Sequence, residues 1–326
     1  MPIRSKIVAA LAFCPIAMGF FTLAQAQTFP AKPVRIVIPF AAGGAVDTVG
    51  RMVGAKLSEA WKQAVVVENR PGAGGIIAAD TVAKSPPDGH TSLLATIALA
   101  VTPSTYRKLP YDPIKDLVPL TQITAHSLVL TVNPKLGVGS FAQLIDLEKS
   151  KRGSLSYGTT GTGTSTHLLI EMLNLALKTE FVHIPYKGDA PQVAAMLGGE
   201  VQLGLVAVIS VINHIQGGKL KPVGVTGNKR SPLLPEVPTM AENGIAGFET
   251  GSWMGLFVPA GVPGEVMTRF QGEVAKVIAL PDMRERFAKQ GFEGIGNTPQ
   301  EFNARYQADA TTYARVVREA KIPPQE

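Results

Sequence analysis

Glycine-rich loops that lead from an apolar stretch into a helical pattern are the parts of this sequence best suited to bind a ligand. The first, residues 39–47 (PFAAGGAVD), follows an apolar stretch and precedes apolar residues at helical spacing. Glycines let backbone N–H groups turn toward a ligand, and a helix N-terminus favours an anion by about 0.3–1 kcal/mol. The loop is therefore a candidate cradle for a carboxylate or phosphate, with an ordinary tight turn as the alternative. Asp47 is expected to cap or brace it, because a carboxylate aimed at an anion would repel it.

A second loop of this kind is residues 157–168 (YGTTGTGTSTHL), where five threonines and a serine stand beside the start of an apolar helical pattern. Hydroxyl groups next to exposed helix N–H groups form a dense set of hydrogen-bond donors. A helix-capping role for Thr164 would account for one hydroxyl only. The glycines lack the third member of a dinucleotide fingerprint. Two cradles in different halves of the chain predict an extended ligand held between two lobes.

Two further glycine turns precede helical patterns, at residues 68–75 (ENRPGAGG) and 183–191 (HIPYKGDAP). Lys187 could pair with an anionic ligand, although an exposed lysine is usually only solvated. Asp189 is expected to cap the helix that begins near Ala190, and in a pocket it could instead accept from an amine or hydroxyl. These two roles for Asp189 imply different ligands.

Motifs of nucleophilic, phosphate-transfer and metal catalysis are missing from the sequence. It has no G-x-S-x-G, Walker or H-E-x-x-H motif, and its single cysteine, Cys14, lies near the N-terminus. The five histidines show no metal-ligand spacing and are interpreted as structural. The formal net charge of +6 is spread along the chain, which argues against a nucleic-acid partner. The sequence therefore predicts a protein that is not an enzyme and has no cofactor or metal.

Short apolar stretches alternate with helical patterns along most of the chain, which is typical of parallel α/β sheets. Strands are predicted at residues 34–40, 64–67, 92–99, 127–132, 154–157, 181–186, 201–208, 222–225 and 253–258. Helices are predicted at residues 46–61, 165–177, 191–197, 209–216, 265–279, 282–290 and 299–320. A chain of 326 residues corresponds to about two domains, and no low-complexity linker separates them.

The N-terminus has the pattern of a secretory signal peptide. Arg4 and Lys6 precede an apolar stretch at residues 7–23, and residues 24–26 (AQA) form a small-residue cleavage site. An uncleaved anchor is the alternative, but the apolar stretch is short for a span of about 20 residues. A lipoprotein is disfavoured because Phe13 precedes Cys14. Cleavage would leave a cysteine-free chain from Gln27, which suits an oxidising compartment such as the periplasm.

At its loops the chain resembles the receptors of tripartite tricarboxylate transporters, often called Bug proteins. The shared motifs, in order, include IVIPFAAGGAVDTVGR, VVENRPGAGG, KLPYDPIKDLVPL, YGTTGTGTSTHL, HIPYKG, GGEVQLG, GVTGNKRSPLLPEVPTMAENG and SWMGLFVPAGVP. The resemblance implies an α/β fold of the type II periplasmic binding proteins, with two lobes that close on a ligand. It places a signal peptide at 1–26, lobe 1 at 27–125 plus 252–326, and lobe 2 at 126–251. Two crossing strands, near 129–133 and 253–258, would join the lobes.

The resemblance also implies which residues contact a carboxylate. In such receptors the loop after the first strand binds one carboxylate, the hydroxyl-rich loop lies opposite, and strand ends flank the cleft. The implied ligand-binding residues are Phe40, Ala42, Gly43, Gly44, Thr96, Thr159, Thr160, Gly163, Thr164, Ser165, Asp189 and Ala207.

Two departures from the family bear on the ligand. The position of Asp189 is often small or uncharged in the family, so an acidic residue there admits an amino acid or hydroxy acid. The segment 96–100 (TIALA) is more apolar than is usual, which favours an aromatic or longer-chain acid.

We therefore expect a monomeric periplasmic receptor that delivers a small organic carboxylate, dicarboxylic or aromatic, to the transporter's membrane permease subunits. A ligand-loaded partner of a membrane sensor kinase, an amino-acid or hydroxy-acid receptor, and a secreted hydrolase on a similar scaffold are the alternatives.

Overall fold

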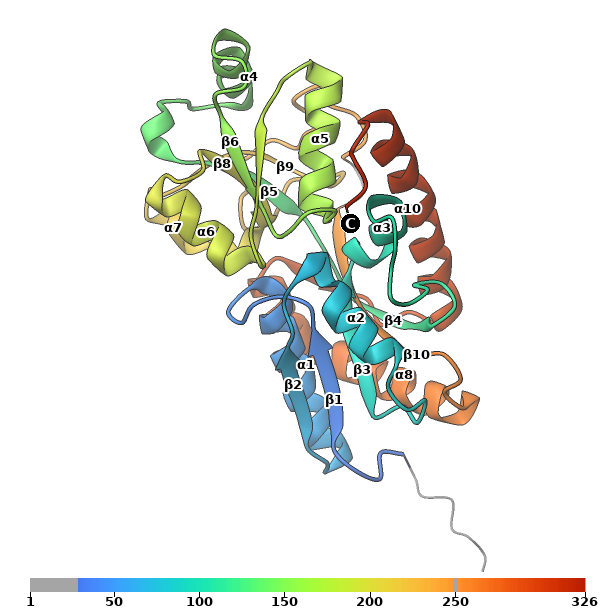
Figure 1. The fold of residues 1–326 in the computed structure, drawn as a ribbon. Helices are drawn as coiled ribbons and strands as arrows, with labels where there is room; N and C mark the ends of the chain where they lie inside the picture. The colour runs from blue at the N-terminus through green and yellow to red at the C-terminus, as the bar shows by residue number, and fades with distance from the viewer. Residues whose placement is uncertain (1–28, 249–250, 326) are drawn as a thin grey trace, which may run out of the picture.

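The computed structural model describes residues 29–248 and 251–325, which form two α/β lobes, each built on one sheet (Figure 1). The larger sheet has six strands in the order β11-β4-β10-β3-β1-β2, and the smaller has five in the order β7-β6-β8-β5-β9. Helices flank both sheets. The two-lobed α/β fold predicted from the sequence is confirmed.

The six-stranded lobe is built from the two ends of the described chain. Its elements are β1 (Val34–Ile38), α1 (Ala45–Trp61), β2 (Val65–Asn69), η1 (Ala73–Gly75), α2 (Ile76–Ala83), β3 (Thr91–Thr96), α3 (Ala98–Thr105), β4 (Leu117–His126), β10 (Ser252–Pro259), α8 (Gly264–Ala279), α9 (Pro281–Lys289), β11 (Phe292–Gly294) and α10 (Pro299–Glu319). The C-terminal helix α10 packs beside α3 and β4 (Figure 1).

The five-stranded lobe is built from the middle of the chain. Its elements are β5 (Leu128–Val132), η2 (Pro134–Leu136), α4 (Phe141–Ser150), β6 (Ser156–Thr159), α5 (Ser165–Leu177), β7 (Val182–Pro185), α6 (Asp189–Gly198), β8 (Leu203–Ala207), α7 (Val208–Gln216) and β9 (Lys221–Val225). Strand β5 is fully buried and occupies a position between β8 and β9.

The prediction of parallel sheets is only half right, because both sheets are mixed. Strands β1, β2 and β3 pair in parallel, but β10 runs antiparallel to β3 and β4. Strand β5 likewise runs antiparallel to β8 and β9. The sequence patterns do not predict β4, β11, α3 or α4, whereas α2 follows the predicted glycine turn at residues 68–75. Strand β4 carries Pro119 and polar residues, so it lacks the apolar run of a central strand and is defined by its pairing with β10.

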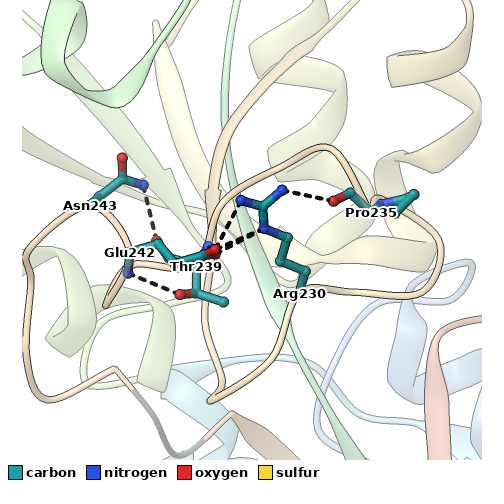
Figure 2. A network of polar contacts seen from close by, with 5 residues as sticks. All are labelled: Arg230, Pro235, Thr239, Glu242 and Asn243. Carbon is teal, nitrogen blue, oxygen red and sulfur yellow. Dashed lines mark hydrogen bonds and ion pairs between the residues drawn. The ribbon is translucent and has the colours of Figure 1, made fainter.

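The chain passes from one sheet to the other at Ser127, between β4 and β5, and returns in the segment between β9 and β10. A network of polar contacts braces the returning segment (Figure 2). The Arg230 guanidinium donates to both carboxylate oxygens of Glu242, at 2.9–3.1 Å, and to the Pro235 carbonyl at 3.1 Å. Glu242 also accepts from the Thr239 N–H at 2.7 Å. Hydrogen bonds from Arg230 and Thr239 lower the pKa of Glu242 to about 2.

Between β10 and α10 an aromatic cluster forms part of the core, and it closes over Gly255. The Phe302 ring is fully buried, with its centre 5.1 Å from that of Trp253 and 5.2 Å from that of Phe257. A Cβ added at Gly255 would overlap the Phe302 ring. The glycine therefore provides the space in which the ring packs.

We expect Gly255→Ala to lower the free energy of unfolding by about 1–3 kcal/mol, because the buried ring has to shift. Gly272→Ala is the matched control, since a Cβ there meets no atom within 4 Å and alanine favours the helix by roughly 0.5–1 kcal/mol. Urea unfolding of both variants measures the difference. Equal stability of the two variants would contradict the packing argument.

Within residues 29–248 and 251–325, no helix has both the length and the apolar character needed to cross a membrane. The expected signal peptide, residues 1–26, lies outside the described residues.

Candidate functional site

A small cavity lies between the two lobes, where strand ends and helix starts from both sheets meet. Its volume of about 40 Å³ is far below the roughly 300–1,000 Å³ of a typical ligand pocket. The residues that line it are Phe40, Gly44, Ala45, Val46, Asp47, Thr96, His126, Leu128, Thr160, Ser165, Thr166, Asp189, Ala207, Ser252 and Met254. A molecule the size of a metabolite can enter only when the lobes separate.

The N-terminus of α1 forms one wall of the cavity. Gly44 precedes the helix in an extended conformation (φ −87°, ψ 178°) and, as a glycine, has no side chain to cap the first turn. Asp47 holds the loop from behind: its Oδ2 accepts from the Gly43 N–H at 3.0 Å and its Oδ1 from Asn69 Nδ2 at 3.0 Å. The Arg51 guanidinium lies 2.9 Å from the same carboxylate. The predicted bracing role of Asp47 is confirmed.

The charge of Asp47 is balanced inside its own lobe. Burial acts to raise its pKa, but hydrogen bonds from Arg51, Gly43 and Asn69 outweigh that effect, and the pKa lies below its usual value. Asp47 therefore stays ionised at neutral pH, paired with Arg51.

The hydroxyl-rich loop before α5 forms the opposite wall. Thr164 precedes the helix, but its side chain makes no capping bond; its Oγ1 donates to the Gly161 carbonyl at 2.7 Å. Thr166 organises the loop instead. Its Oγ1 accepts from the Thr160 N–H at 3.2 Å and lies 3.2 Å from Thr160 Oγ1 and 2.9 Å from Thr164 Oγ1. The first N–H groups of α5 are thereby left open toward the cavity.

We expect Thr166→Val to lower the free energy of unfolding by about 1–3 kcal/mol, because the partly buried Thr160 N–H loses its acceptor. Thr162→Val in the same loop is the control, with an expected change within about 0.5 kcal/mol. Chemical denaturation of the two variants tests the difference. A Thr166→Val variant as stable as the control would show that Thr166 does not hold the loop.

Four helices point uncapped N-termini at this cavity. Besides α1 and α5, helix α6 begins at Asp189 after Gly188, and α7 begins directly after Ala207; neither has a side-chain cap. Ser140 and Thr298 cap α4 and α10, and α2, α3, α8 and α9 also lack a side-chain cap, but none of these six N-termini lines the cavity. None of the described residues lining the cavity is a lysine or an arginine. The groups there that favour a small anion are therefore the helix N-termini.

Asp189 joins the two lobes across the cavity. Its Oδ2 accepts from Ser210 Oγ of α7 at 2.7 Å and, at the long distance of 3.5 Å, from the Ala45 N–H of α1. Burial raises the pKa of this carboxyl, and the bonds from Ser210 and Ala45 partly offset that rise. The prediction that Asp189 caps its own helix is wrong, because Gly188 occupies the capping position and the carboxylate turns toward the other lobe.

The histidines nearest the cavity are held neutral by burial. His126 lines the cavity and packs edge-on against Phe292, and burial lowers its pKa to about 4. His167 and His183 stack at 3.9 Å beneath the hydroxyl-rich loop, with pKa values lowered to about 4 and about 3. His183 Nε2 lies 2.7 Å from Thr159 Oγ1. The described residues contain no group of three metal-binding side chains.

The structure brings together seven of the residues implied by the resemblance: Phe40, Gly44, Thr96, Thr160, Ser165, Asp189 and Ala207. The others do not line the cavity. Ala42 and Gly43 are exposed on the outer side of their loop, and Thr159, Gly163 and Thr164 are buried beneath theirs. The apolar residues after Thr96 do not line it either, because α3 begins at Ala98 and turns away. Lys187 is exposed and likewise does not line the cavity.

Several lining residues were missed by the sequence reading. Ala45 and Val46 follow the predicted loop directly, and Thr166 lies within the second loop, so a wider window around each glycine cluster would have included them. His126, Leu128, Ser252 and Met254 carry no local signal. They reach the cavity because β4, β5 and β10 meet at the connection between the lobes.

Known proteins resemble this chain over nearly its whole length. A family model described as the tripartite tricarboxylate transporter family receptor matches residues 49–322. The structure of Rpa4515 from R. palustris with adipate is 33% identical, with a TM-score of 0.88; the match covers 91% of this chain and 100% of that one. The periplasmic binding protein BugD is 32% identical (TM-score 0.87, coverage 91% and 100%). MatC from Rhodopseudomonas palustris with bound malate is 29% identical (TM-score 0.83, coverage 89% and 100%).

Proposed function

This chain belongs to the tripartite tricarboxylate transporter receptor family, whose members are periplasmic substrate-binding receptors and not enzymes, and we propose that it captures a small organic carboxylate in the cavity between its lobes. The observation that carries the proposal is the meeting of four uncapped helix N-termini around a space without lysine or arginine. First-turn N–H groups lack intrahelical partners and can donate to carboxylate oxygens. Micromolar binding corresponds to about −8 kcal/mol, within reach of such donors and a closing cleft.

The ligand class follows from the mixture of groups in the cavity. Hydroxyls of Thr96, Ser165, Thr166 and Ser252 supply neutral hydrogen-bond partners, and four side chains supply an apolar wall: Phe40, Val46, Leu128 and Met254. We infer a mono- or dicarboxylate with a short carbon chain or ring. The adipate and malate named for the two relatives make these acids the first probes to use.

The receptor cycle needs two lobes that separate and close. We place lobe 1 at residues 27–125 plus 252–326 and lobe 2 at 126–251, with Ser127 and the segment before Ser252 as the connections. The ligand favours the closed form through contacts made to both lobes at once. We infer that the closed receptor delivers its ligand to the membrane permease of the transporter, in the periplasm, after cleavage of the leader at residues 24–26.

Thermal unfolding with a panel of carboxylates tests the binding step. An acid present at about 100 times its Kd should stabilise the receptor by about 2.7 kcal/mol, a rise in Tm of roughly 5 °C. Titration calorimetry should confirm one site, and native mass spectrometry should detect any acid that co-purifies. A broad panel without any shift, together with a ligand-free mass, would refute carboxylate binding.

Delivery is tested separately, in cells that lack the receptor gene. Uptake of the identified acid should fall in the deletion strain and return with the wild-type gene. Uptake that persists, together with loss of a transcriptional response to the acid, would favour a role as the partner of a sensor kinase.

A further inference from the structure

We propose that the Asp189 carboxylate occupies the place at the α1 N-terminus where a ligand carboxylate would bind. Binding of a carboxylate ligand that has no amino group then takes up one proton. The inference rests on the proposed function and concerns the same cavity. It gives Asp189 a role in setting the net charge of the ligand that the cleft accepts.

The position of Asp189 supports this role. Its Oδ2 faces the Ala45 N–H, a group that a bound anion would use, and its Cβ lies 3.5 Å from the place where a Cβ of Gly44 would be. The other oxygen, Oδ1, makes no hydrogen bond to another described residue. A ligand carboxylate at α1 would therefore stand directly beside the Asp189 carboxylate.

The charges around Asp189 leave it without a compensating cation. From α1, the nearest titratable groups are Asp47 and Arg51, which pair with each other at 2.9 Å. From β4, His126 reaches the cavity and is neutral above about pH 4 because of its burial. Helix α7 presents the hydroxyl of Ser210, and α5 presents Ser165 and Thr166. Lys187, two residues before Asp189, is exposed and does not line the cavity.

Two adjacent carboxylates between the lobes repel each other strongly, because little water remains to screen them. Protonation of Asp189 removes the repulsion. The neutral acid can keep its contact with Ser210 and can donate its proton to a ligand oxygen. Near neutral pH, Asp47 stays ionised because its pKa is lowered, and His126 stays neutral. Asp189, whose pKa is raised by burial, is therefore the group of the cavity lining that can take up the proton.

Calorimetric titration of the full-length mature receptor with adipate and malate tests the proposal. At pH 8, heats measured in buffers of different ionisation enthalpy should show uptake of about one proton per ligand, and affinity should fall about tenfold per pH unit as pH rises. In Asp189→Asn, proton uptake should vanish, and binding at pH 8 should be at least about tenfold tighter than in the wild type. Asp146→Asn removes the same charge from an exposed site of the same lobe and should behave as the wild type.

The outcomes separate this inference from the proposed function. Binding without proton uptake, or equal proton uptake in Asp189→Asn, would overturn the role of Asp189 and leave carboxylate capture intact. Weaker binding of Asp189→Asn by the same factor at every pH would also overturn it, since Asp189 would then be an ordinary hydrogen-bond acceptor for the ligand. Absence of binding to both the wild type and Asp189→Asn by the full acid panel would refute the proposed function itself.

Discussion

Replacing Gly44 by leucine is expected to weaken carboxylate binding at least about 100-fold, a loss of about 2.7 kcal/mol. A Cβ at Gly44 would lie 3.5 Å from the Asp189 Cβ, which is ordinary contact, but the further carbons of leucine have to enter the cavity or separate the lobes. The backbone of Gly44 is extended, with a φ of −87°, so leucine is not strained there. Calorimetry with the best acid of the panel measures the loss.

The matched control is Ala42→Leu, in the same loop but on its exposed side. We expect it to bind within about twofold of the wild type, because a surface substitution away from the cavity changes energies by less than about 0.5 kcal/mol. Circular dichroism should show the same fold for both variants. A Gly44→Leu variant that keeps its affinity within tenfold of the wild type would show that the ligand binds away from α1.

A second large effect is expected in acid: the free energy of unfolding should fall by about 6 kcal/mol between about pH 6.5 and pH 4. His126 and His167 are buried, and burial lowers their pKa values from about 6.5 to about 4. The unfolded chain therefore binds more protons than the folded chain in this window, so the free energy of unfolding falls as pH falls. Below about pH 4 these two histidines cause no further change. Each histidine accounts for about 3 kcal/mol over the full window.

Together the two histidines contribute about 6 kcal/mol, which is comparable to the lower end of the stability of a typical protein, about 5–15 kcal/mol. The raised pKa of Asp189 acts in the opposite direction, because its protonation in acid relieves a buried charge. Below about pH 4, protonation of Asp47, whose pKa is lowered, removes further stability. Urea unfolding at steps of half a pH unit from pH 7.5 to 4 measures how the free energy of unfolding depends on pH.

His167→Asn isolates one contribution. His167 Nδ1 accepts from the Gly163 N–H at 3.2 Å, and an asparagine oxygen can take over that bond without being protonated. We expect a lower stability at pH 7.5 but a pH dependence that is reduced by about 3 kcal/mol. Val193→Ala, a substitution of a buried residue in the same lobe, should lower the free energy of unfolding by the same amount at every pH. A pH dependence of His167→Asn equal to that of the wild type would contradict the assignment.

Local patterns were enough to predict much of the scaffold. The spacing of apolar residues predicts helix α1 to within one residue of its start, and the glycines and hydroxyls of residues 157–168 predict the loop before α5. These predictions succeed because helical periodicity and glycine turns are encoded by neighbouring residues. The order of the motifs also carried the family resemblance, which the match over residues 49–322 confirms.

Other features depend on residues that are distant in sequence. Strand β4 has no strong pattern of its own and is defined by pairing with β10, more than 120 residues later. Thr166, not Thr164, organises the loop before α5, because the Thr160 N–H turns toward it. Asp189 illustrates the limit most clearly: its sequence position predicts a helix cap, whereas its carboxylate bonds Ser210 and faces Ala45 of the other lobe.

The sequence by itself thus determined the two α/β lobes, the family and the loops that offer backbone N–H groups to an anion. Helix propensity, turn chemistry and apolar periodicity act over a few residues, so they can be read along the chain. Only the tertiary structure decided which side chains share the cavity, that four helix N-termini meet there, and that Asp189 lies among them with no lysine or arginine in the lining. Those facts depend on how the two lobes close, and closure brings together segments that no local interaction connects.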